Sequence, residues 1–249
     1  DGIKKYSQWN GDYPYSQVTA VDGTISAGGG MEYPNVTVIG SSGNKEALEV
    51  VIVHEVGHNW FYGILGSNER DFGWMDEGLN TLNEMRYVAE KYPKNTRLSD
   101  MAGGAARKLG FEGLSHKDEG DVMYRCMASF CVDQPIHSHS ADFSSANYGG
   151  VMYQKTGLVF HYLKAYLGDS LFDACMQAYF ERWKFRHPQP EDFRAVLEEV
   201  SKQDLGWLFD GLIDSRKVVD YKIVGVRQAV GKSLVKVKSV GQINGPIAV

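Results

Sequence analysis

The order of apolar and polar residues along the chain predicts a mainly helical protein with short strands near both ends. Residues 135–147, in which Ser and His are scattered, indicate a loop. Helical spacing of apolar residues runs through the segments 46–64, 76–92, 95–115, 119–135, 148–167, 171–183, 191–200 and 205–213. These patterns predict an α+β fold in which helices dominate.

Two strand-like runs precede the helical region. Val18 to Ile25 and Met31 to Ile39 are rich in β-branched residues and are separated by a glycine turn, so we expect a small N-terminal β-sheet lobe. Pro34 lies within the second run and predicts an edge strand, because proline cannot donate a hydrogen bond to a ladder.

Two further runs follow the helical region. Tyr221 to Val226 and Leu234 to Val240 alternate like strands, and Gly231 with Lys232 suggests a hairpin turn between them. We therefore expect one domain over residues 1–217 and a short β segment over residues 218–249. This segment resembles the opening of a β-sandwich-like module that is cut short within this sequence.

Composition narrows the possible partners. The chain has 249 residues, 43% of them hydrophobic and 23% charged, which is typical of a globular protein. Its formal net charge of -5 gives no broad positive field, so nucleic acid is excluded as the expected partner. No apolar run is long enough to cross a bilayer. The 3 cysteines are too few for a disulfide framework.

Residues 46–64 carry the strongest chemical signal. Their apolar residues fall on every face, which predicts a helix that is buried all round. This segment nevertheless contains His54, Glu55 and His58. Histidines four positions apart lie on one helix face and can bind one metal ion, and zinc accepts histidine nitrogen readily. Glu55 then lies beside the attacking water without binding the metal, as a general base would.

Two core histidines and a surface glutamate are the alternative interpretation of this motif. It would leave ionisable groups inside an apolar helix without partners, which is costly. A third protein ligand is needed, and Glu77 follows His58 after 18 intervening residues. Glu77 alone could be an acid favoured at a helix N-terminus. Beside the histidine pair, it completes a two-histidine, one-glutamate zinc set with an open fourth position. Thr81 could hydrogen-bond a ligand or could be an ordinary helix residue.

Three further segments make the resemblance to a family specific. Residues 29–33 read GGMEY, residues 153–157 read YQKTG, and PEDF at 190–193 is followed by WLF at 207–209. With the zinc motif, these resemble the gluzincin pattern of the M1 aminopeptidase family, including its G-x-M-E-N and Y-x-K-G motifs. The likeness spans about residues 9–240. It implies a thermolysin-like zinc peptidase domain with one zinc ion.

The resemblance also implies roles for individual residues. Glu32 would bind the free α-amino group of a peptide, and Tyr153 would hydrogen-bond the developing oxyanion. Gly30 and Met31 would form part of an edge strand along which the substrate backbone lies. Tyr148 would be a wall of the pocket.

Two departures from the family pattern matter for these roles. Tyr33 stands where the family has Asn, so the substrate contacts at that position must differ. The family's N-terminal β domain, which supplies a second group near the substrate amine, is missing from this sequence. We therefore expect this chain by itself to cleave poorly.

The resemblance implies a zinc metallopeptidase that removes single residues from peptides with a free N-terminus, with Glu55 as general base. A gluzincin endopeptidase and a non-catalytic, zinc-containing peptide-binding module remain alternatives. The oligomeric state stays open, and a bacterial cell-envelope or exported location is an expectation only.

Overall fold

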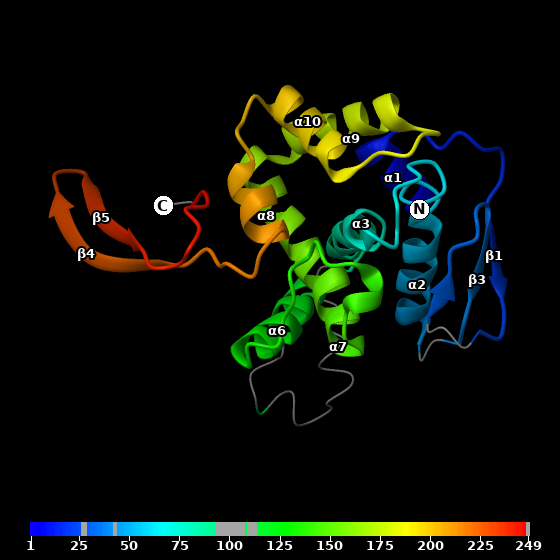
Figure 1. Ribbon diagram of the computed structural model, residues 1–249, viewed down its shortest axis with the longest axis horizontal. Coiled ribbons are helices and arrows are strands. Elements are labelled where there is room, and N and C mark those ends of the chain that lie inside the picture. The colour runs from blue at the N-terminus through cyan, green and yellow to red at the C-terminus, as the bar shows by residue number, and fades with distance from the viewer. Residues whose placement is uncertain (26–28, 42–43, 93–107, 109–113, 248–249) are drawn as a thin grey trace.

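A computed structural model describes residues 1–25, 29–41, 44–92, 108 and 114–247 (Figure 1). Its α-helices are α1 (Gly2–Asn10), α2 (Lys45–Gly57), α3 (Glu77–Lys91), α6 (His116–Ser129), α7 (Ser145–Asn147), α8 (Thr156–Leu167), α9 (Asp169–Trp183) and α10 (Pro190–Ser201). The strands are β1 (Thr19–Asp22), β2 (Gly30–Met31), β3 (Val36–Ile39), β4 (Tyr221–Ala229) and β5 (Lys232–Ser239). Helices dominate, as predicted, while nearly all of the predicted helix 95–115 falls outside the described residues.

Four short helical segments link these elements. The turns η1 (Gly73–Met75) and η2 (Ser140–Asp142) are 3-10 helices, and η3 (Tyr148–Lys155) and η4 (Trp207–Ile213) are π-helical. η3 leads directly into α8, so the predicted helix over 148–167 is present but changes its hydrogen-bonding pattern midway. Among the residues described here, no helix combines the length and the apolar character that a membrane span requires.

The small sheet has the strand order β1-β3-β2, with β1 parallel and β2 antiparallel to β3. The prediction of a single strand over residues 31–39 is therefore wrong. The chain leaves the sheet around Pro34 and turns through Asn35, which has a positive φ of 63°, so β3 becomes the central strand and β2 an edge. The sheet lies alongside α2 at the right of Figure 1.

The helix predicted over residues 46–64 is shorter in the structure. α2 ends at Gly57, and His58 is its C-cap. The apolar residues that follow form a tight turn in which Tyr62 has a φ of 110°, a value that no α-helix accommodates. The prediction of burial on every face was also wrong for the first turns of α2, because Leu48 is 38% exposed. Only the last five residues, Val53 to Gly57, which carry the candidate site, are buried without interruption.

The core is formed where α2 and α3 meet α8, α9 and α10. It is rich in aromatic side chains; those that are wholly buried include Trp60, Trp74, Phe160, Phe172, Phe180 and Phe193. α1, which the sequence patterns did not predict, adds Tyr6 and Trp9 to this core. The candidate site therefore rests on two helices that a large apolar core fixes in place.

The hairpin β4–β5 projects from the helical body at the left of Figure 1. Most of its residues are exposed on both faces. The chain then returns to the body, where Ile243 is buried against Gly211 and Tyr162 donates a hydrogen bond to the carbonyl of Pro246. Residues after the hairpin thus contribute to the same core as residues before it.

Candidate active site

His54 and His58 project from the end of α2 toward the first residue of α3, Glu77. Two close approaches hold the helices in this arrangement. A methyl group on Gly57 would lie 2.0 Å from the Asn80 side-chain oxygen, so only glycine lets α2 come so near to α3. Asn80 in turn donates from its side-chain nitrogen to the carbonyl of His54 at 2.7 Å.

The three predicted ligands converge on one point. The Nε2 atoms of His54 and His58 lie 3.2 Å apart, and the Oε2 atom of Glu77 lies 3.2 Å from the first and 3.3 Å from the second. Zinc bonds of 2.0–2.1 Å in tetrahedral geometry place ligand atoms about 3.3–3.4 Å apart. The triangle of donor atoms therefore fits a zinc ion with its fourth position open.

Carboxylates contact both imidazole rings at Nδ1, the nitrogen that faces away from the candidate metal position, and so orient the rings. His54 Nδ1 donates to Glu84 Oε2 at 2.9 Å, and His58 Nδ1 donates to Asp76 Oδ1 at 2.6 Å. Because each Nδ1 atom is engaged by a carboxylate, Nε2 is the ring atom left to face a metal. Thr81, considered above as a partner of a ligand, donates to the main-chain carbonyl of Glu77 and thus steadies the helix start rather than the carboxylate.

Glu55 lies beside the candidate ligands with part of its carboxylate unpartnered. Its Oε2 atom is buried and has no hydrogen-bond partner within the described residues. The side chain lies directly against Gly30, where a methyl group would come within 2.3 Å of the carboxyl carbon. An unsatisfied carboxylate oxygen beside a metal triangle suits a group that receives a proton from water.

Strand β2 brings Glu32 to the same place. Its carboxylate lies within 4.8 Å of ligand atoms of Glu55 and His58, and likewise of Asp76 and Glu77. Met31, its neighbour, is held in the sheet, where its carbonyl accepts a hydrogen bond from Thr37. Tyr33, the departure from the family pattern, is 55% exposed. This side of the site is therefore acidic and would attract a cationic group.

Burial and the neighbouring charges shift the pKa of several groups in the site. Burial is the largest effect on Glu55 and raises its pKa to about 7, although the two histidines oppose this shift. Burial would lower the pKa of His54, but the hydrogen bonds with Glu77 and Glu84 outweigh it and raise this pKa to about 10. Burial would raise the pKa of Glu84, but hydrogen bonds from His116 and His54 hold it far below its usual range. The site is therefore rich in negative charge that a cation would neutralise.

η3 supplies the two tyrosines predicted for the site. The ring of Tyr153 stacks on the ring of His54 with centroids 5.9 Å apart. Burial, reinforced by the Glu77 carboxylate beside it, raises the pKa of Tyr153, so the phenol stays protonated and can donate. Tyr148 lies farther out, with its ring 5.8 Å from that of Tyr153, and is 39% exposed. π-helical segments such as η3 are frequent at functional sites.

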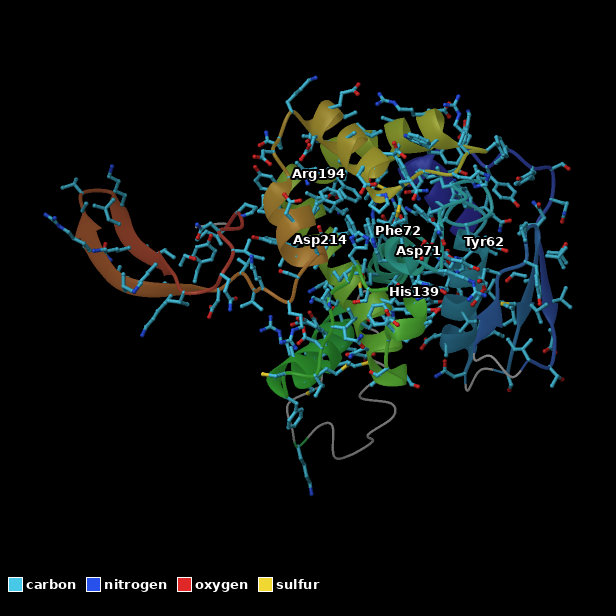
Figure 2. All side chains as sticks on the ribbon, viewed as in Figure 1. Tyr62, Asp71, Phe72, His139, Arg194 and Asp214 are labelled. Carbon is cyan, nitrogen blue, oxygen red and sulfur yellow. The ribbon has the colours of Figure 1, made fainter. Side chains whose placement is uncertain are left out.

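The connector between α2 and α3 is held by the loop that follows α6. Asp71 forms an ion pair with His139 across 3.4 Å, and Figure 2 shows both beside Phe72 near the middle of the molecule. Ser140 donates from its main-chain nitrogen to the carbonyl of Arg70 at 2.7 Å. The loop after α6 therefore fixes the connector, which in turn sets where α3 begins.

Four residues that support the candidate ligands were not predicted from the sequence: Asp76, Asn80, Glu84 and His116. For Glu84 a signal was available, because it lies seven residues after Glu77 and so falls on the same face of α3 two turns later. For His116 there was none, since it is 32 residues from Glu84 and belongs to another helix.

Comparisons with known proteins identify the family of this chain. The model of the peptidase family M1 domain matches residues 4–212. Aminopeptidase N of Lactococcus lactis is 24% identical over 194 residues, which cover 74% of this chain and 21% of that protein. Glutamyl aminopeptidase of Rattus norvegicus is 25% identical over 173 residues, covering 70% of this chain and 17% of that protein.

Solved structures show the same fold. An M1 zinc metallopeptidase from Deinococcus radiodurans superposes with a TM-score of 0.65 at 16% identity, over 87% of this chain and 43% of that one. Yeast LTA4 hydrolase gives a TM-score of 0.61 at 18% identity, over 86% of this chain and 34% of that one. The chain spans about a fifth of the length of the curated relatives. With the family model matching most of its length, the chain belongs to peptidase family M1.

Proposed function

We propose that this chain carries the catalytic centre of a zinc metallopeptidase that removes single residues from the free N-terminus of peptides. One observation carries the proposal: three donor atoms 3.2–3.3 Å apart lie beside a buried glutamate oxygen that has no partner among the described residues. Structural zinc sites are closed by four protein ligands, whereas this set leaves one position open.

The residues of the chain divide the chemistry among them. His54, His58 and Glu77 would hold the ion, which when bound supplies Lewis acidity toward water and toward a peptide carbonyl. Glu55 accepts a proton from the attacking water and delivers it to the departing amine. Tyr153 donates a hydrogen bond to the carbonyl oxygen as negative charge develops on it.

Removal of one residue at a time is supported by the acidic side chain of Glu32 beside the candidate ligands. Glu32 lies within 4.8 Å of Glu55 and His58, so an ammonium group paired with it would stand one residue from the scissile bond. β2 is at the edge of its sheet, and an extended peptide can add to such an edge. A peptide docked in this way enters only as far as its own N-terminus.

The proposal is tested with an aminoacyl reporter panel on the intact protein, with and without a chelator. Glu55→Gln should retain zinc and lose turnover by about 10²–10⁴-fold, because a general base contributes that much. Turnover that survives either the chelator or this substitution would refute the proposed chemistry.

Glu32→Gln separates an aminopeptidase from an endopeptidase. The substitution should raise KM strongly for peptides with a free amine and leave N-blocked peptides unaffected, because only the free amine pairs with this carboxylate. The matched pair of free and blocked peptides is the control. Efficient cleavage of blocked peptides by the unaltered protein would favour an endopeptidase. Zinc binding without any turnover would favour a peptide-binding module.

A further inference from the structure

The support of the metal centre continues beyond the carboxylates that contact the histidines. Glu84 Oε2 accepts from His54 Nδ1 at 2.9 Å, and Glu84 Oε1 accepts from His116 Nε2 at 2.6 Å. The three side chains are only 11%, 12% and 11% exposed. The two hydrogen bonds thus form a largely buried chain that runs from His54 on α2 through Glu84 on α3 to His116, the first residue of α6.

We propose that His116 is a positioning residue of the metal centre, which acts on the ligand His54 by fixing the Glu84 carboxylate. This inference rests on the zinc site of the proposed function. A carboxylate held at one oxygen can rotate about its broad terminal torsion. With a partner at each oxygen it cannot, and the ring of His54 is then held in the orientation that directs Nε2 at the ion.

The start of α6 is built to place His116 firmly. Ser115 and Asp118 form a reciprocal capping box immediately around it. Gly120, one turn later, lies so close to η3 that a methyl group there would come within 2.1 Å of the Gln154 side chain. The start of α6 is capped and its body packs closely against η3, so the position of the His116 imidazole beside Glu84 is fixed.

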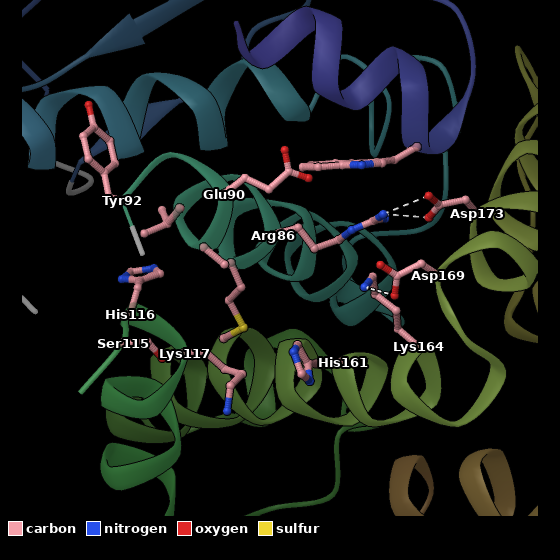
Figure 3. A pocket seen from close by; sticks show the side chains of 14 residues that line it. Arg86, Glu90, Tyr92, Ser115, His116, Lys117, His161, Lys164, Asp169 and Asp173 are labelled. Carbon is pink, nitrogen blue, oxygen red and sulfur yellow. Dashed lines mark hydrogen bonds and ion pairs between the residues drawn. The ribbon is translucent and has the colours of Figure 1, made fainter. Parts of the chain in front are cut away.

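His116 also lines a cavity of about 330 Å³ (Figure 3). Lys117 and His161 line the same cavity, and Figure 3 shows His161 on the neighbouring helix α8. His161 makes no hydrogen bond to any described residue. It is therefore a matched control, because it lines the same cavity as His116 but takes no part in the hydrogen-bond chain to His54.

The test measures zinc affinity by competition with a chromogenic chelator, on the intact protein and without substrate. Loss of a residue that orients a metal ligand typically costs about 10–100-fold in affinity, and His116 acts one step farther out, so about fivefold to tenfold is expected for His116→Leu. His116→Gln should restore most of the affinity, because its amide nitrogen reaches about as far as Nε2. His161→Leu should bind zinc as tightly as the unaltered protein.

A double-mutant cycle with Glu84→Gln separates positioning from mere packing. If His116 acts through Glu84, His116→Leu should change zinc affinity less than twofold once Glu84 is replaced. Independent, multiplying effects would overturn the inference, and so would equal losses in the Leu and Gln variants. Wild-type affinity in His116→Leu would overturn it as well.

These outcomes are distinguishable from failure of the proposed function. A protein that binds zinc with the expected ranking of variants, but cleaves no peptide, would refute the peptidase and leave the role of His116 standing. Normal cleavage with no effect of His116→Leu on zinc affinity would refute the role of His116 and leave the peptidase standing. The apo-protein melting temperature of each variant shows whether a loss of affinity reflects a loss of folding, and His116→Gln supplies the test should His116→Leu not fold.

Discussion

The two tyrosines of η3 differ in a way that kinetics can measure. Tyr153 stacks on the candidate ligand His54, while Tyr148 lies farther from the metal triangle and is 39% exposed. Removing the hydroxyl of Tyr153 with Tyr153→Phe should lower kcat by about 10²–10³-fold with little change in KM, because the hydrogen bond strengthens only as charge develops.

Tyr148→Phe is the matched control for this prediction and should change kcat less than Tyr153→Phe by at least tenfold. Zinc content should be equal in both variants. A rise in KM at constant kcat for Tyr153→Phe would show instead that this phenol binds the substrate in its ground state.

Residue types and spacing were enough to predict which three candidate ligands the structure brings together, but not the residues that support them. The i and i+4 histidines fix two ligands on one helix face, whatever the rest of the chain does. Asn80 supports the site through an amide that reaches another helix, and no local spacing marks such a contact. The hydrogen bond of His116 likewise depends on how α6 packs against α3, which is a property of the fold and not of any motif.

At the scale of elements, Glu49 ties α2 to the end of α3. Its carboxylate accepts hydrogen bonds from Tyr87, Tyr92 and Lys91. Burial would raise the pKa of Glu49, but these donors lower it from 4.5 to about 2. A lowered pKa in the folded state means that the charged carboxylate stabilises the fold above about pH 4.5, and that this contribution is lost as pH falls toward 2.

We therefore expect Glu49→Gln to be less stable than the unaltered protein at pH 6 by about 1–2 kcal/mol, and the difference to shrink as the pH falls from 4.5 to 2. Urea unfolding of both proteins across this range, with a chelator present so that metal release plays no part, measures it. A difference that stays constant with pH would show that the charge of Glu49 contributes nothing.

The helices were easier to predict than their ends. Long periodic segments such as α3, α9 and α10 were predicted within a few residues, because each buries one apolar stripe. The end of α2 was missed because its apolar run continues past Gly57 into a turn that tertiary packing holds. α1 was missed because nine residues cannot sustain a helix by propensity alone, and the burial of Tyr6 and Trp9 decides it.

At the scale of the whole molecule, the chain beyond residue 217 has two parts with different roles. The hairpin β4–β5 is largely exposed, whereas Ile243 is 6% exposed and belongs to the main core. Tyr221 pairs with Ser239 at the base of the hairpin. The hairpin can therefore be shortened there without moving the chain that follows it.

Replacing Lys222 to Lys238 by Asn-Gly, which closes a two-residue turn, should change the free energy of unfolding by less than about 0.5 kcal/mol. Ile243→Ala should cost about 2–5 kcal/mol, because it leaves a cavity in the core. Chemical denaturation of both variants tests this. A large loss on shortening the hairpin, or none for Ile243→Ala, would show that the exposed ribbon and not the returning segment stabilises the body.

The contact between Gly30 and Glu55 has a consequence for how a peptide would be bound. The strand edge and the base touch without a side chain between them, so neither shifts without displacing the other. A peptide that binds along β2 and restrains this strand would thereby restrict the positions that the Glu55 carboxylate can adopt. Coupling of this kind is reciprocal, so a change that favours the carboxylate position found with peptide bound should also favour peptide binding. Peptide binding at β2 and the alignment of Glu55 would then depend on the same contact between Gly30 and Glu55.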